Sequence, residues 1–227
     1  MRGAPAARRD DRHPRLSRLG FVMNTDLFLA FLMMTVVLVI TPGPVVTLVI
    51  ATGATDGVRA ALLTVLGTTL GNALLIGAVA FGLHFVLASS AVLFDVIRYV
   101  GAAYLVWLGI GLWRKAGRGP VMLAAVHSRV HLSRGFLVAL SNPKTAAFFT
   151  AFLPQFVDPT LPAQFQLAVM CAASVLIAAL LDSGWGIAAG LGRAWFIAPA
   201  RAKLLGRFSG TVLIGGGIWL SLVRRPA

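Results

Sequence analysis

Long stretches without a charged side chain dominate the sequence and predict helices that cross a membrane. Taken as candidate spans, these stretches predict six helices at about 26–52, 60–88, 92–113, 135–157, 163–191 and 206–223. The third reaches membrane length only if Asp95 and Arg98, both at one end, extend their charged groups to water. Residues 114–134 are basic and interrupted by glycine and proline, so they form a linker that divides the chain into two halves of three helices.

The first predicted helix of each half is interrupted by proline near its middle. The interruptions are Thr41-Pro42-Gly43-Pro44 and Ser141-Asn142-Pro143-Lys144. Proline has no N–H and clashes with the preceding turn, so each break exposes backbone groups that need a partner within the membrane. A single proline often only kinks a helix, but matched breaks in two halves point to a transporter site in an inverted repeat. The expected fold is an all-α polytopic membrane protein whose six helices form a 3+3 inverted repeat, with helices 1 and 4 broken.

Composition supports a membrane protein and excludes a soluble enzyme. Hydrophobic residues make up 58% of the 227 residues and charged residues 12%, whereas about a quarter of the residues of soluble domains are charged. The net charge of +13 does not indicate a nucleic-acid partner, because the bases lie between apolar stretches and not on one solvated face. The lone Cys171 excludes an intrachain disulfide and a paired-thiol redox site.

The distribution of Lys and Arg predicts the orientation in the membrane. Ten of them lie in the linkers after helices 1, 3 and 5, and three lie on the opposite side. Residues 1–22 carry six more arginines and lack the apolar core of a secretory signal. We interpret them as a disordered or wrongly assigned extension, and residues 23–225 as one transporter domain. With Met23 as the start, the basic linkers face the cytoplasm and both termini face outward. If the extension stays inside, the topology reverses or a broken segment re-enters without crossing.

Several motifs, in order along residues 23–223, resemble the LysE/RhtB family of amino-acid exporters. The matching segments are Thr41-Pro42-Gly43-Pro44, 53–59 (GATDGVR), 67–72 (GTTLGN), 101–109 (GAAYLVWLG), 136–144 (FLVALSNPK), 152–156 (FLPQF), 182–185 (DSGW) and 208–217. The resemblance implies a multi-pass transporter of the bacterial inner membrane that expels amino acids or close derivatives, driven by a proton or ion gradient and without a cofactor. It leaves the amino acid open, because members of the family serve lysine, arginine, threonine, homoserine and leucine.

An amino-acid exporter must hold an ammonium and a carboxylate inside the membrane, and broken helices supply groups for both. The N-terminal end of a half-helix presents free amides to the carboxylate, and the opposite end presents carbonyls to a cation. Asn72 in helix 2 reaches either the cavity or a neighbouring helix. The candidate substrate-binding residues are Thr41, Pro42, Gly43, Pro44, Asn72, Asn142, Pro143 and Lys144.

Charged residues inside predicted spans are functional candidates because their burial is costly. Lys144 is expected to bind the substrate carboxylate or pair with an aspartate, unless it extends to water at a helix end. Asp182 is the candidate for the coupling proton or for the substrate ammonium, unless it is interfacial or a structural partner of Lys144. Asp56 is a second candidate for ion coupling, although a solvated turn or an ion pair with Arg59 also fits its position.

Other classes of function fit the sequence less well. An intramembrane protease would need a serine, zinc or paired-aspartate motif, and the sequence has none. A divalent-cation or other metabolite exporter of related architecture is the alternative, but one deep aspartate offers few ligands, and His127 and His131 lack acidic or cysteine partners in the sequence. No metal site is expected. Glycines spaced four apart, such as Gly67 and Gly71, are interpreted as helix contacts. A homo-oligomer is left open.

Overall fold

The computed structural model describes residues 23–89, 91–116, 128–192, 195 and 199–222, and all of its regular structure in these ranges is helical. The elements are α2 (Thr25–Ile40), α3 (Pro44–Asp56), α4 (Val58–Ser89), α5 (Ala91–Lys115), α6 (Ser128–Leu140), α7 (Pro143–Phe152), the 3₁₀ helix η1 (Leu153–Phe156), α8 (Ala163–Leu191) and α10 (Pro199–Leu222). The predicted extension 1–22 lies outside the described residues. So does most of the linker, although α6 begins within it, at Ser128.

Two pairs of short helices meet end to end at the proline breaks. The axes of α2 and α3 differ by 49°, and those of α6 and of α7 with η1 by 41°. Three helices, α4, α5 and α8, are long and apolar enough to cross a membrane, and each bent pair could form one further crossing. The described residues therefore contain three to five candidate spans. The last helix, α10, is not among them, and basic residues lie near its start.

Local sequence explains where the halves of the first bent pair begin and end. The Asn24 side chain accepts hydrogen bonds from the amides of Asp26 and Leu27 and so caps α2. At the break between the two helices, Pro44 occupies the first turn of α3, where a missing N–H costs nothing. Gly57, which separates α3 from α4, has a φ of 88°, a conformation that side-chain-bearing residues adopt only with strain.

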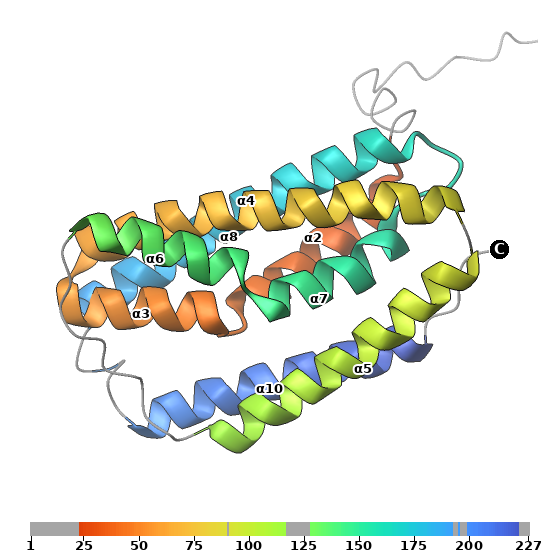
Figure 1. Ribbon diagram of the computed structural model, residues 1–227. Helices are drawn as coiled ribbons and strands as arrows, with labels where there is room; N and C mark the ends of the chain where they lie inside the picture. The colour runs from red at the N-terminus through yellow and green to blue at the C-terminus, as the bar shows by residue number, and fades with distance from the viewer. Residues whose placement is uncertain (1–22, 90, 117–127, 193–194, 196–198, 223–227) are drawn as a thin grey trace, which may run out of the picture.

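Small residues allow the helices to cross at close range. A Cβ atom on Gly67 of α4 would lie 2.0 Å from the carbonyl oxygen of Leu132, and one on Gly135 of α6 would lie 2.3 Å from that of Thr64. The interpretation of Gly67 as a helix-contact residue is therefore confirmed. Gly109 of α5 and Gly210 of α10 face each other in the same way, and these two helices run side by side in Figure 1.

The helix ends fall into two groups, at opposite ends of the bundle (Figure 1). At one end Asp56 of α3 lies 3.7 Å from His131 of α6, measured from carboxylate oxygen to Nε2. At the other end the Asn24 side chain donates a hydrogen bond to Asp158, which follows η1. Between the two ends, the core includes a cluster of aromatic rings from α2, α7 and η1. This core holds both broken helices against the long helices.

Candidate functional site

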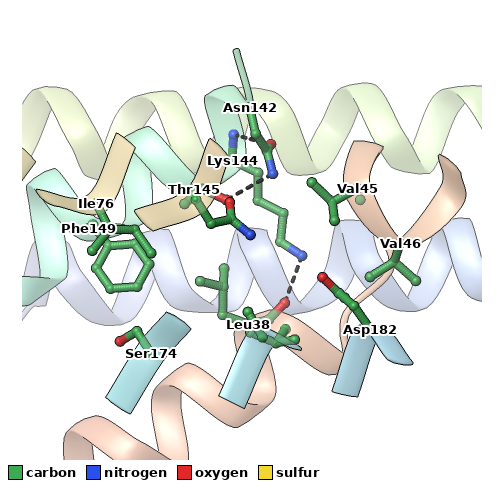
Figure 2. A pocket seen from close by; sticks show the side chains of 14 residues that line it. Leu38, Val45, Val46, Ile76, Asn142, Lys144, Thr145, Phe149, Ser174 and Asp182 are labelled. Carbon is green, nitrogen blue, oxygen red and sulfur yellow. Dashed lines mark hydrogen bonds between the residues drawn. The ribbon is translucent and has the colours of Figure 1, made fainter. Parts of the chain in front are cut away.

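A small polar cavity lies where the two broken helices meet (Figure 2). Its volume is about 40 Å³, enough for roughly three water molecules. Elements α2, α3, α4, α7 and α8, together with the break at Gly43, contribute its walls. The residues that line it are Leu38, Val39, Gly43, Val45, Val46, Asn72, Ile76, Asn142, Lys144, Thr145, Phe149, Ser174, Ala178 and Asp182.

The Lys144 side chain bridges the two breaks. Its ammonium donates hydrogen bonds to the backbone carbonyls of Leu38, at 2.7 Å, and of Thr41. In a continuous helix the Leu38 carbonyl would accept from the amide of residue 42, but residue 42 is proline and has no N–H. Lys144, from the second half of the chain, supplies the missing donor. Because Lys144 is only 5% exposed, it does not extend to water at a helix end.

The two half-helices that start at the breaks have different N-terminal ends. The Asn142 side chain accepts from the Lys144 amide and donates to the Thr145 hydroxyl, so α7 is capped by its own sequence. The N-cap of α3 is Gly43, which has no side chain to offer. Among the described residues, the amides of Val45 and Val46 in the first turn of α3 have no hydrogen-bond acceptor. The free positive end of a helix dipole therefore faces the cavity from α3.

Asp182 faces the cavity from α8 (Figure 2). The residue is 2% exposed, and its Oδ1 atom has no hydrogen-bond partner among the described residues. No oxygen of its carboxylate comes within 4.0 Å of the Lys144 ammonium, so the two do not form an ion pair in this structure. The side-chain oxygen of Asn72 on α4 is buried in the same cavity, and the described part of the chain offers it no hydrogen-bond donor. The cavity thus combines an ammonium, a carboxylate and an unpaired amide oxygen.

Most of the predicted site residues gather at this place. Gly43, Asn72, Asn142, Lys144 and Asp182 line the cavity. Thr41 contributes its carbonyl to Lys144, and the three prolines Pro42, Pro44 and Pro143 form the breaks themselves.

Asp56 does not join this group. It lies at the end of α3, and its ion-pair partner among the described residues is His131 and not the nearby Arg59. The alternative of a local ion pair with Arg59 is therefore not found: Asp56 lies beside His131 of α6 instead. Sequence reasoning treated His131 as a metal candidate without acidic partners, and it missed this long-range contact. Within the described part of the chain, no three His, Cys, Asp or Glu residues are grouped as a metal site.

The apolar wall and two hydroxyls of the cavity, those of Thr145 and Ser174, were also missed. Ser174, Ala178 and Asp182 lie on one face of α8 and all line the cavity. Their spacing of four residues could have revealed Ser174 and Ala178, since residues at i and i+4 of a helix share a face. Ile76 could have been found in the same way, because it follows Asn72 by four residues on α4. Phe149 has the same spacing from Thr145, but Thr145 was not itself a candidate.

Apolar helices long enough to cross a bilayer, together with two bent helix pairs that meet at a cavity containing charged and polar groups, are typical of membrane translocators. Comparison of the chain with known protein families agrees with this class. The family model described as LysE type translocator matches residues 36–223. The chain therefore belongs to the LysE family of membrane translocators, and it is not an enzyme.

Relatives with assigned names include efflux proteins. The chain is 30% identical over 204 residues to the homoserine/homoserine lactone efflux protein of Salmonella typhi, which covers 89% of this chain and 99% of that protein. It is 32% identical over 136 residues to the leucine efflux protein of Klebsiella pneumoniae, and the match covers 58% of this chain and 63% of that protein. An uncharacterized membrane protein of Vibrio cholerae is 33% identical over 207 residues, or 89% of this chain and 100% of that protein. No solved structure matches the chain significantly.

Proposed function

We propose that this protein exports amino acids or their close derivatives across the bacterial inner membrane by proton antiport. The observation that carries the proposal is the buried carboxylate of Asp182, which faces a polar cavity between two helix breaks and has an unpartnered oxygen. A carboxylate in this position can hold a proton or a substrate ammonium, and it cannot hold both. Competition for one group is the simplest basis for exchanging a proton for a substrate. The names of the homoserine and leucine efflux relatives support the choice of substrate class.

The cavity offers complementary groups to the two charges of an amino acid. The free amides of Val45 and Val46 at the start of α3 suit a carboxylate, because the end of the helix dipole there is positive. The Asp182 carboxylate suits the ammonium. Asn72 can accept a hydrogen bond from either the ammonium or a polar side chain. We assign the carboxylate to α3 and not to Lys144, because Lys144 already donates to two carbonyls.

The apolar wall favours an uncharged substrate side chain. Ile76 of α4 and Phe149 of α7 lie in this wall, and a second cation there would lose its hydration without gaining a partner. The cavity holds roughly three waters, which is less space than an amino acid needs. Binding therefore requires the broken helices to move apart. The geometry supports amino acids over a divalent cation, because a hard cation would need several oxygen ligands.

The positions of the helix ends support six crossings in a 3+3 arrangement. If each bent pair crosses once and α10 crosses beside α5, each crossing begins at the end of the bundle where the previous one finished (Figure 1). In α10 no charged residue follows Arg207, so residues 208–222 are apolar enough to enter the bilayer next to α5. The ends that precede and follow the basic linkers then lie on the cytoplasmic side. This orientation places the end of α10 outside the cytoplasm. Activity of a reporter that works only in the cytoplasm, fused after residue 222, would contradict it.

Efflux from loaded proteoliposomes tests the function. Vesicles containing the protein are loaded with radiolabelled L-homoserine or L-leucine, and a pH gradient is imposed across the membrane. We expect the gradient to accelerate export of at least one of these probes, and Asp182→Asn to abolish the acceleration. Asp26→Asn is the matched control, because Asp26 is exposed at the start of α2 and should leave export unchanged. Gradient-driven export by Asp182→Asn at the wild-type rate would remove Asp182 from coupling.

A further inference from the structure

The cavity holds one cation and two alternative places that can bind it. The Lys144 ammonium is bound to the carbonyls of Leu38 and Thr41, while the carboxylate of Asp182 lies across the cavity with an unpartnered oxygen. Figure 2 shows the ammonium of Lys144 and the carboxylate of Asp182 pointing toward each other. An ionised carboxylate is a stronger acceptor for an ammonium than a neutral carbonyl is. Binding of Lys144 to the carbonyls is therefore the arrangement expected when Asp182 carries a proton.

In its carbonyl-bound position, Lys144 links the two helix breaks and lies over the break at Gly43. The ammonium ties the end of α2, in the first half of the chain, to the start of α7, in the second half. It also covers the break, because a Cβ atom on Gly43 would lie 2.9 Å from the Lys144 Cδ atom. Glycine at position 43 therefore leaves room for the Lys144 stem. While Lys144 occupies the carbonyls at the end of α2, a second ammonium there would be repelled by its positive charge.

We propose that Lys144 is a tethered ammonium that exchanges between the carbonyls of Leu38 and Thr41 and the carboxylate of Asp182, and that the proton on Asp182 decides which it binds. With the proton bound, Lys144 holds the two breaks together, as in this structure. When the proton leaves, Lys144 moves to Asp182 and the connection between α2 and α7 is lost. The vacated carbonyls then become acceptors for the substrate ammonium.

This inference rests on the proposed function and revises one detail of it, since the substrate ammonium then binds at the end of α2 while Lys144 occupies Asp182. The charges of the two states differ by one. The proton-bound site carries only the charge of Lys144, whereas the substrate-bound site holds Lys144, ionised Asp182 and a zwitterion, which sum to zero. Each exchange of a proton for an amino acid should thus move one net charge across the membrane.

Only Lys144 and Asp182 are charged among the described residues that line the cavity. The polar groups that α4, α7, α8 and the second break contribute are Asn72, Thr145, Ser174 and Asn142, and none of these titrates near neutral pH. A pH-dependent opening of the cavity can therefore be attributed to Asp182 and Lys144.

Cysteine labelling tests the exchange without any substrate. Replacing Cys171 by alanine removes the only cysteine of the chain, and Ser174→Cys then places one thiol in the cavity, where residue 174 is 1% exposed. The rate of reaction with a water-soluble maleimide is divided by that of Gln164→Cys, an exposed position at the start of α8, to correct for thiol ionisation. We expect the corrected rate to rise with pH, by up to about tenfold per unit for a single proton.

Two variants should fix the cavity in opposite states. Asp182→Asn is expected to keep labelling slow at every pH, because Lys144 has no ionised carboxylate to move to. Lys144→Met is expected to keep it fast, because nothing ties α2 to α7. If Lys144→Met does not fold, Gly43→Ala displaces the lysine stem instead and should label fast. Gly77→Ala is its control, because a Cβ atom there meets no other atom within 4 Å.

The outcomes separate the inference from the proposed function. Corrected labelling that is independent of pH, or that keeps its pH dependence in Asp182→Asn, overturns the exchange of Lys144. Slow labelling of both Lys144→Met and Gly43→Ala overturns it as well. If labelling behaves as expected but no pH gradient drives export of L-homoserine or L-leucine, the exchange stands and the assignment of these amino acids is wrong.

Discussion

Replacing Gly67 by alanine should destabilise the crossing of α4 and α6, which joins the two halves of the chain. The new Cβ atom would lie 2.0 Å from the carbonyl oxygen of Leu132 and 2.9 Å from the amide nitrogen of Phe136. Both are backbone atoms, so no change of rotamer relieves the contact. The two helices must separate by about 1 Å before the shorter distance becomes tolerable.

The size of the effect follows from two opposing contributions. Forcing a methyl group into a packed interface costs about 1–3 kcal/mol, whereas alanine in place of glycine within a helix gains up to about 1 kcal/mol. Gly77→Ala isolates the second contribution, because position 77 lies on the same helix and its Cβ atom meets nothing within 4 Å. The two variants should therefore differ by about 1–3 kcal/mol. For a chain of this size that corresponds to roughly 2–12 °C in melting temperature.

Thermal unfolding of the detergent-solubilised protein, followed by circular dichroism, measures this difference. Gly77→Ala should melt at or above the wild-type temperature, and Gly67→Ala clearly below it. Gly135→Ala, on the other side of the same crossing, should show a similar loss, because its Cβ atom would lie 2.3 Å from the carbonyl oxygen of Thr64. Equal melting temperatures for Gly67→Ala and Gly77→Ala would show that the helices do not cross as closely as described.

Three further predictions concern single contacts. Asp56→Asn and His131→Gln should each lower the melting temperature, and the double variant should lose less than their sum, because the two side chains are 3.7 Å apart; strict additivity would mean that they do not interact. Asn142→Ala should cost about 1 kcal/mol of unfolding free energy by removing the cap of α7, and an unchanged denaturation curve would contradict that role. Hydrogen bonds, the largest contribution coming from the Thr160 hydroxyl, lower the pKa of Asp158, so its stabilisation is complete above the usual aspartate pKa of about 3.9 and is lost as pH falls through the lowered value. Asp158→Asn should therefore remove part of the fall in melting temperature below about pH 4, and an identical pH profile would refute this.

How much of the site the sequence revealed depended on the type of residue. Prolines and buried charges stand out in an apolar sequence, so Pro42, Lys144 and Asp182 were identified as candidates before any contact was known. Placing a charge or a helix-breaking proline in an apolar span costs free energy, so such residues are rare there and mark candidate sites. Phe149 is one of three phenylalanines in α7, so nothing in the sequence distinguished the one that lines the cavity.

The sequence by itself determined the helical class and the positions of both breaks, because charge placement and proline act locally along the chain. It did not determine what the freed backbone groups bind. Only the tertiary structure brings Lys144 to the Leu38 carbonyl across more than a hundred residues and places Asp56 beside His131. Each of these contacts depends on how the two halves pack against each other, and helix packing is decided by the fit of surfaces distant in sequence, which no local pattern encodes.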